Sequence, residues 1–209
     1  MRDAFTQKEC LLIQKLNTPQ KVQNFLYQLP YNPKDTLFSF RNVARHHKAH
    51  CLEGALFTAC ILEQHGYPPL LLDLESKDKI DHVLFLFQKK GLYGTVGVSK
   101  DIGLHGRRPI FKTPHDLVSS YFEAYINEEA CITAYATYDL RDLKNYDWRF
   151  QKKNCKKVEQ TLIDLPHTPF HFKNEKYKKE LERYRQYCQR YAHEKEFPMD
   201  YWKDQHTWW

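Results

Sequence analysis

The fold of this chain is decided by residues 49–66, which read AHCLEGALFTACILEQHG. Apolar side chains recur there at steps of three and four residues, which is typical of a helix with one face in a core. They are Leu52, Ala55, Leu56, Ala59 and Leu62. Gly66 stands where a glycine commonly ends a helix, and prolines follow at 68 and 69. The pattern predicts a buried helix over residues 51–65 whose first turn carries Cys51.

The segments around this helix predict an α+β fold. Three strand-like runs follow it, and Lys89-Lys90-Gly91 between the last two is typical of a hairpin turn. They are Leu70 to Leu74, His82 to Phe87 and Leu92 to Val98. Thr18-Pro19 and Thr113-Pro114 each combine a capping residue with a proline at the first helical position. Helices are also expected through Leu11, Leu12 and Leu16, from 114 through Leu117, Tyr121 and Tyr125, over 152–165 and over 174–196. Helices, then antiparallel strands, then helices is an α+β order.

Length and composition narrow the class of protein. A chain of 209 residues fits one domain, expected over 1–209 with a core at about 34–150 and a helical, aromatic-rich extension at about 151–209. The apolar runs are far shorter than the ~20 residues of a spanning helix, and the first residues form no export signal. The six cysteines contain no Cys-x-x-Cys pair, which favours reduced thiols. We therefore expect a cytoplasmic protein that does not contact a membrane.

Cys51 and His82 are the candidate catalytic pair. At the first turn of a helix, unpaired N–H groups and the helix dipole stabilise a thiolate, which is the nucleophilic form of cysteine. The same N–H groups could stabilise an oxyanion. His82 begins an apolar strand, and the two residues are 31 positions apart, which is enough chain to fold His82 back against the helix start. Taken singly, each residue has an ordinary structural explanation: Cys51 would be an inert thiol in the core, and His82 a solvated histidine at the edge of a strand. Together they favour a cysteine–histidine site.

The residues around this pair resemble those of bacterial transglutaminase-like domains, which have a papain-like cysteine hydrolase and acyltransferase fold. The resemblance covers about residues 38–126 and is carried by Ala49 to Ala55, Gly66 to Leu74, Asp81-His82-Val83, Tyr93 to Val96, Arg108-Pro109 and Ser119 to Phe122. It implies that Cys51 is the nucleophile, that His82 is the base, and that an Asp or Asn on the next strand orients the histidine. Gly97, Val98 and Ser99 occupy that third position instead. Ser99 is a weak substitute, and Asp101 and Asp73 are alternatives.

These observations favour a cysteine-dependent acyl-transfer enzyme: an amidase, peptidase or transglutaminase-type enzyme. Its substrate would be a peptide, a protein or a small amide or ester, and the resemblance implies no organic cofactor. The alternative is a catalytically inactive binding module on the same fold, favoured by the absence of a carboxylate at the third position.

A metal site is a further alternative, because His46, His47, His50 and Cys51 are dense in donor atoms. The basic residues Arg41, Arg45 and Lys48 surround them without a carboxylate close by in sequence, so we expect no metal. Glutamates dilute the lysines of the last predicted helix, so a nucleic-acid surface is not expected either. The aromatic stretch 197–209 is expected to dock on the domain, because an exposed aromatic segment would be adhesive.

Overall fold

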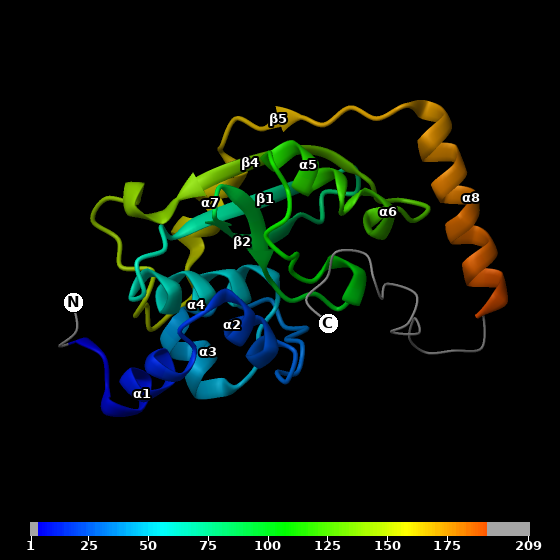
Figure 1. Ribbon diagram of the computed structural model, residues 1–209. Helices are drawn as coiled ribbons and strands as arrows, with labels where there is room; N and C mark the ends of the chain where they lie inside the picture. The colour runs from blue at the N-terminus through cyan, green and yellow to red at the C-terminus, as the bar shows by residue number, and fades with distance from the viewer. Residues whose placement is uncertain (1–3, 192–209) are drawn as a thin grey trace.

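The structure of residues 4–191, a computed structural model, is built around helix α4, Cys51–Glu63, which lies against an antiparallel sheet (Figure 1). Eleven consecutive residues of α4, from Leu52 to Leu62, are buried. The glutamate and threonine among them, Glu53 and Thr58, use their polar atoms in hydrogen bonds. The predicted helix is confirmed, although it ends two residues earlier than expected, before Gly66 with its φ of 84°.

The sheet has five strands in the order β3-β2-β1-β4-β5, and every neighbouring pair is antiparallel. The strands are β1 (Leu70–Ser76), β2 (His82–Lys89), β3 (Leu92–Val96), β4 (Ile132–Asp139) and β5 (Thr168–Pro169). Lys90 and Gly91 join β2 to β3, and both have positive φ angles, as a two-residue hairpin turn requires. The expected α+β class and the three predicted strands are confirmed, whereas β4 and β5 were not predicted.

Two helical layers cover the two faces of the sheet (Figure 1). The helices α1 (Gln7–Lys15), α2 (Pro19–Leu26) and α3 (Phe40–His46) gather around α4 on one face. The helices α5 (Pro114–Ser119) and α6 (Phe122–Tyr125) lie on the other. Each face has its own buried apolar cluster, and α7 (Lys156–Ile163) contributes Val158 and Leu162 to the cluster around α4.

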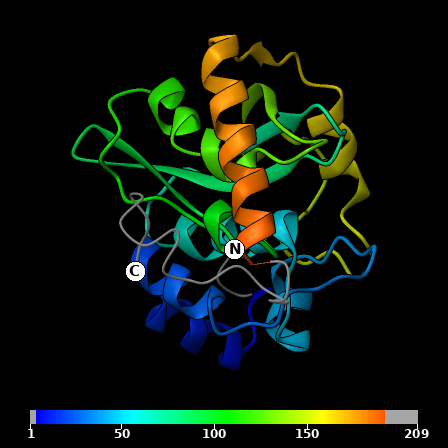
Figure 2. The same cartoon turned by 90° about the vertical axis from the view of Figure 1, so that its right-hand side faces the viewer.

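The last described helix, α8 (Asn174–Arg190), runs along the outside of the molecule from the α5–α6 side toward the layer of α4 (Figure 2). Arg183 pairs with Glu123 of α6 at 3.0 Å, and Arg185 pairs with Glu128 at 2.8 Å. The aromatic stretch 197–209, which we expect to dock on the domain, lies outside the described residues. Among residues 4–191, no helix is long and apolar enough to cross a membrane.

Two predicted elements end or break at residues that make tertiary hydrogen bonds. The strand predicted to reach Val98 ends at Val96, because the Gln23 side chain donates to the Gly97 carbonyl and accepts from the Gly97 N–H, each at 2.9 Å. The helix predicted from 114 through Tyr125 breaks between α5 and α6, where the Tyr121 hydroxyl bonds Thr95 and the His105 carbonyl. Both departures lie near the N-terminus of α4, where the candidate site is found.

Candidate active site

Cys51 is the first residue of α4, and its partly exposed side chain lines a cavity of about 290 Å³. His50 is the N-cap residue and has an extended backbone, so the chain turns sharply into the helix between the two residues. The free N–H groups of the first helical turn lie beside the sulfur in such an arrangement, where the dipole favours a negative charge. The local sequence therefore places the thiol where a thiolate is stabilised.

His82 begins β2 and reaches the same cavity, although its side chain is only 3% exposed. Its Nε2 lies 2.7 Å from the Leu104 carbonyl oxygen. Because a carbonyl only accepts, this contact requires the proton to be on Nε2, which leaves Nδ1 as the ring nitrogen available to Cys51. His82 lines the same cavity as Cys51 and is one of the two imidazoles that lower the pKa of its thiol. The structure thus brings together the two residues that the sequence pairs.

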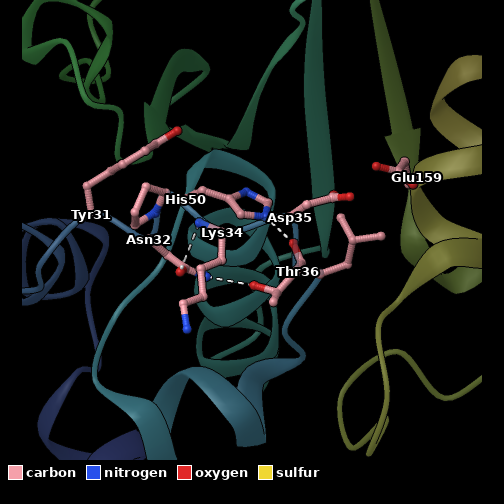
Figure 3. Close-up of a pocket in the computed structure, with 9 residues that line it drawn as sticks. Tyr31, Asn32, Lys34, Asp35, Thr36, His50 and Glu159 are labelled. Carbon is pink, nitrogen blue, oxygen red and sulfur yellow. Dashed lines mark hydrogen bonds between the residues drawn. The ribbon is translucent and has the colours of Figure 1, made fainter.

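His50 is a second imidazole that lowers the pKa of the Cys51 thiol. Its Nε2 donates to the Thr36 carbonyl and lies 3.5 Å from a Glu53 carboxylate oxygen, so its Nδ1 is the nitrogen left for Cys51. Figure 3 shows the His50 ring between Tyr31 and Thr36, with the dashed line to Thr36. Sequence analysis placed His50 among the donors near the thiol without assigning it a contact.

The two histidines make Cys51 strongly acidic. Burial by itself would raise the pKa of the thiol, but hydrogen bonds from His50 and then His82, together with their charges, lower that pKa to about 5. For His50, burial opposes the charged form, yet the bond to Cys51 and the charges of Cys51 and Glu53 raise its pKa to about 9. Between these two values, Cys51 and His50 form a thiolate–imidazolium pair.

Glu53 anchors the segment that carries His50. Its carboxylate is fully buried one turn into α4 and accepts four hydrogen bonds of 2.6 to 3.0 Å. The donors are the Asn32 amide, the Thr36 hydroxyl and the backbone N–H groups of Phe38 and His50. Sequence analysis missed this role. The available signal was a glutamate three residues after an N-cap, the spacing of a capping box.

The group that orients His82, for which the sequence suggested Ser99 or Asp101, is a backbone carbonyl in the structure. The Ser99 hydroxyl accepts from the Asp101 N–H at 3.1 Å, and the Asp101 carboxylate accepts from the Gly103 N–H at 2.8 Å. Both residues line the cavity, but their hydrogen bonds order the loop rather than the imidazole. The group that holds the His82 ring is the Leu104 carbonyl in the short 3-10 helix η2 (Ile102–Leu104). A backbone carbonyl has no sequence signature.

Asp73, the other alternative, belongs to a separate pair. It is buried in β1, and His167 lies 3.2 Å from its Oδ2. Burial, reinforced by the neighbouring Asp81 charge, raises the pKa of Asp73 to about 6. Its carboxylate therefore pairs with His167 rather than orienting His82.

Figure 3 shows a second cavity, of about 410 Å³, and Tyr31 lines both this cavity and the first. His50, the N-cap residue of α4, lines this second cavity, and so does Glu159 of α7. Asp78, Asp81 and Asp101 line the first cavity together with the apolar Ile80, Ala124 and Ala130. The thiol therefore opens into the first cavity, while its neighbour His50 lines the second.

Of the predicted cluster of donors, the structure brings His50 to Cys51, while the His46 ring stacks on Phe38 with centroids 5.0 Å apart. His47 ends α3 in a left-handed conformation. Within the described residues, no three His, Cys, Asp or Glu side chains converge as a ligand set for a metal ion.

No family model matches the sequence, and no curated protein matches it. Among solved structures, the chain is similar to Legionella pneumophila LapG, with 11% identity and a TM-score of 0.37, over 67% of this chain and 83% of that one. Calcium-bound LapG gives 12% identity and a TM-score of 0.38, over 72% and 86% of the two chains. EGTA-treated LapG gives 11% and 0.38, over 68% and 88%. Because these TM-scores are low, the roles of Cys51 and His82 are inferred from this chain's own geometry.

Proposed function

We propose that this protein is a cysteine-dependent acyl-transfer enzyme of transglutaminase-like type, an amidase, peptidase or transglutaminase-type enzyme, with Cys51 as its nucleophile. One observation carries the proposal: a thiol at a helix N-terminus lines a cavity together with His82, next to the N-cap His50. These two imidazoles lower the pKa of that thiol. The remaining buried thiols have the opposite environment, because burial raises the pKa of Cys60, Cys131 and Cys155. Cys51 alone among these four is set up as a thiolate at neutral pH.

The chemistry follows from the positions of the protons. The Cys51 thiolate attacks the carbonyl carbon of an amide or ester, and the carbonyl oxygen becomes an oxyanion beside the N–H groups at the start of α4. As the carbon–nitrogen or carbon–oxygen bond breaks, the imidazolium form of His82 gives its Nδ1 proton to the leaving group. Water or an amine then attacks the thioester and gives a proton to His82. The acyl group leaves as an acid or a new amide, and the thiolate is regenerated.

The two histidines have different tasks in this scheme. His50 is held between Thr36 and Glu53 and stays protonated up to about pH 9, so it keeps the sulfur anionic. His82 is oriented by the Leu104 carbonyl, which leaves its Nδ1 to exchange a proton with the reacting groups. Keeping the thiolate and moving the proton are therefore assigned to separate side chains.

A catalytically inactive binding module on the same fold is the second candidate. It is favoured by the uncharged carbonyl on His82, because a carboxylate there would stabilise an imidazolium more strongly. In that case the cavity at Cys51 would hold a ligand without transferring an acyl group.

Alkylation with iodoacetamide at pH 6, mapped by peptide mass spectrometry, tests the nucleophile. Cys51 should react first, while the buried thiols Cys60 and Cys155 serve as internal controls. The His82→Ala variant should slow Cys51, and His65→Ala should not, because His65 bonds the Ile13 carbonyl away from the site. Equal, slow labelling of all the cysteines would contradict the proposal.

Turnover then separates the two candidates. Amide, ester and peptide substrates should be converted by the wild-type protein and not by Cys51→Ala. A reactive Cys51 with no turnover on any of these classes would favour the binding module.

A further inference from the structure

Arg107 is a buried arginine that the proposed chemistry does not use. Its side chain is completely shielded from solvent, and within residues 4–191 no carboxylate lies within the 4.0 Å of an ion pair. Burying an unpaired charge is expensive unless its donors are all engaged. The hydrogen bonds of the guanidinium offset this desolvation cost, and its partners show which part of the structure it holds in place.

The donors of Arg107 reach two segments, the loop of Gly103 to His105 and Ser120, whose carbonyl also accepts from Nη2 at 3.4 Å. Nη1 donates to the His105 carbonyl at 2.8 Å and Nη2 to the Gly103 carbonyl at 2.6 Å. Nε bonds the Ser120 hydroxyl at 3.3 Å, and the guanidinium lies 4.0 Å above the Tyr121 ring. The planar fork of arginine can hold two carbonyls at fixed angles, and the single ammonium of lysine cannot.

The two carbonyls that Arg107 holds flank a third one. Leu104 lies between Gly103 and His105, and its carbonyl is the group that accepts the His82 Nε2 proton at 2.7 Å. Holding the peptide groups on both sides of Leu104 restricts the rotation of the planar unit between them, whose own N–H, that of His105, donates to the Ile102 carbonyl at 3.1 Å. The orientation of the His82 ring thus depends on Arg107 through two peptide units.

Other contacts support the same loop. The Tyr121 hydroxyl donates to the His105 carbonyl at 3.0 Å, and its oxygen lies 2.6 Å from the Thr95 hydroxyl. Beside them, a Cβ on Gly94 would lie only 2.9 Å from the Arg107 carbonyl oxygen, so the backbones pack closely there. The loop is therefore held by Tyr121 between α5 and α6, by β3 and by Arg107 together.

We propose that Arg107 is a positioning residue that replaces the orienting acid of a cysteine–histidine–acid site: it fixes the Leu104 carbonyl, which in turn fixes the proton on Nε2 of His82. The inference rests on the proposed function for its effect on turnover. Its effect on the His82 tautomer is independent of that function and can be measured separately.

The decisive measurement is the His82 tautomer, read from long-range ¹H–¹⁵N NMR of the imidazole ring at a pH where the ring is neutral. The wild-type ring should carry its proton on Nε2. In Arg107→Lys the Leu104 carbonyl loses its support, so the Nδ1–H form should appear and kcat should fall at least tenfold while KM changes less than twofold. Arg149→Lys is the matched control, because Arg149 is largely buried but bonds Glu63 on α4.

An unchanged tautomer in folded Arg107→Lys would overturn the inference. If that variant does not fold, Arg107→Ala folded in the presence of guanidinium ion decides. An Nε2–H ring that gives way to the Nδ1–H form as guanidinium is removed supports the inference, and a tautomer that does not respond to guanidinium overturns it. Failure of the proposed function would look different, as an Nε2–H ring in the wild type beside an unreactive Cys51.

Discussion

Replacing His50 by glutamine should move the pH at which Cys51 becomes reactive. The pKa of the thiol is lowered from its ordinary value of 9.0 to about 5, a difference of about 4 pH units, and two imidazoles share in it. At 1.36 kcal/mol for each unit, the difference is on the order of 5 kcal/mol, and about half of it, or about two pH units, is assigned to His50. His50→Gln keeps a polar side chain and removes the charge. The midpoint of Cys51 alkylation should therefore rise by about two pH units.

The assay is the rate of iodoacetamide alkylation at Cys51 between pH 4 and 10. The midpoint is a better measure than the rate at one pH, because a more basic thiolate is also intrinsically more nucleophilic. His65→Gln is the matched control and should keep the wild-type midpoint near pH 5. A midpoint in His50→Gln within half a pH unit of the wild-type value would refute the assignment of His50 as a partner of the thiolate.

Three further changes test the surroundings of the site by the free energy of unfolding. Glu53→Gln leaves one side-chain oxygen for four donors, so it should lower the free energy of unfolding by about 3 kcal/mol. Denaturant titration measures this loss, and a loss below about 1 kcal/mol would contradict the anchoring role of Glu53. The folded pKa of Asp73, about 6, lies above its ordinary value of 3.8, so its ionisation costs stability as pH rises from about 4 to 6. Asp73→Asn should stabilise the protein at pH 7 by at most about 3 kcal/mol, with the gain absent at pH 4. Gly94→Ala should destabilise by about 1–3 kcal/mol, because its methyl group meets the backbone of Arg107 and Pro109 rather than a flexible side chain; wild-type stability would argue against the close packing there.

The sequence predicted the helix and strand that carry the candidate pair because their signals are local. The apolar spacing after Cys51, the glycine at 66 and the turn at Lys89-Lys90-Gly91 each act within a few residues. A thiol at a helix start and a histidine at a strand start could therefore be placed before their contact was known. Both side chains line one cavity in the structure, at positions that the resemblance also pairs.

The parts that the sequence did not predict depend on contacts between distant segments. Residues 132–139 alternate apolar and polar side chains as a strand does, yet their pairing with β1 joins positions about 60 residues apart. The third partner of His82 is a carbonyl, which every residue possesses, so the search for an acid led to Ser99, Asp101 and Asp73. What makes the Leu104 carbonyl distinct is the support of its loop by a buried arginine, and that is visible only in three dimensions.

The most direct test of the central claim is a pre-steady-state reaction with p-nitrophenyl acetate at pH 7, followed by absorbance and by intact mass. Acyl transfer by Cys51 predicts a burst of one equivalent of p-nitrophenolate for each protein molecule and a single acetyl group that maps to Cys51. The burst should be absent in Cys51→Ala. No burst in the wild-type protein, or acetyl groups spread over the other cysteines, would contradict the account.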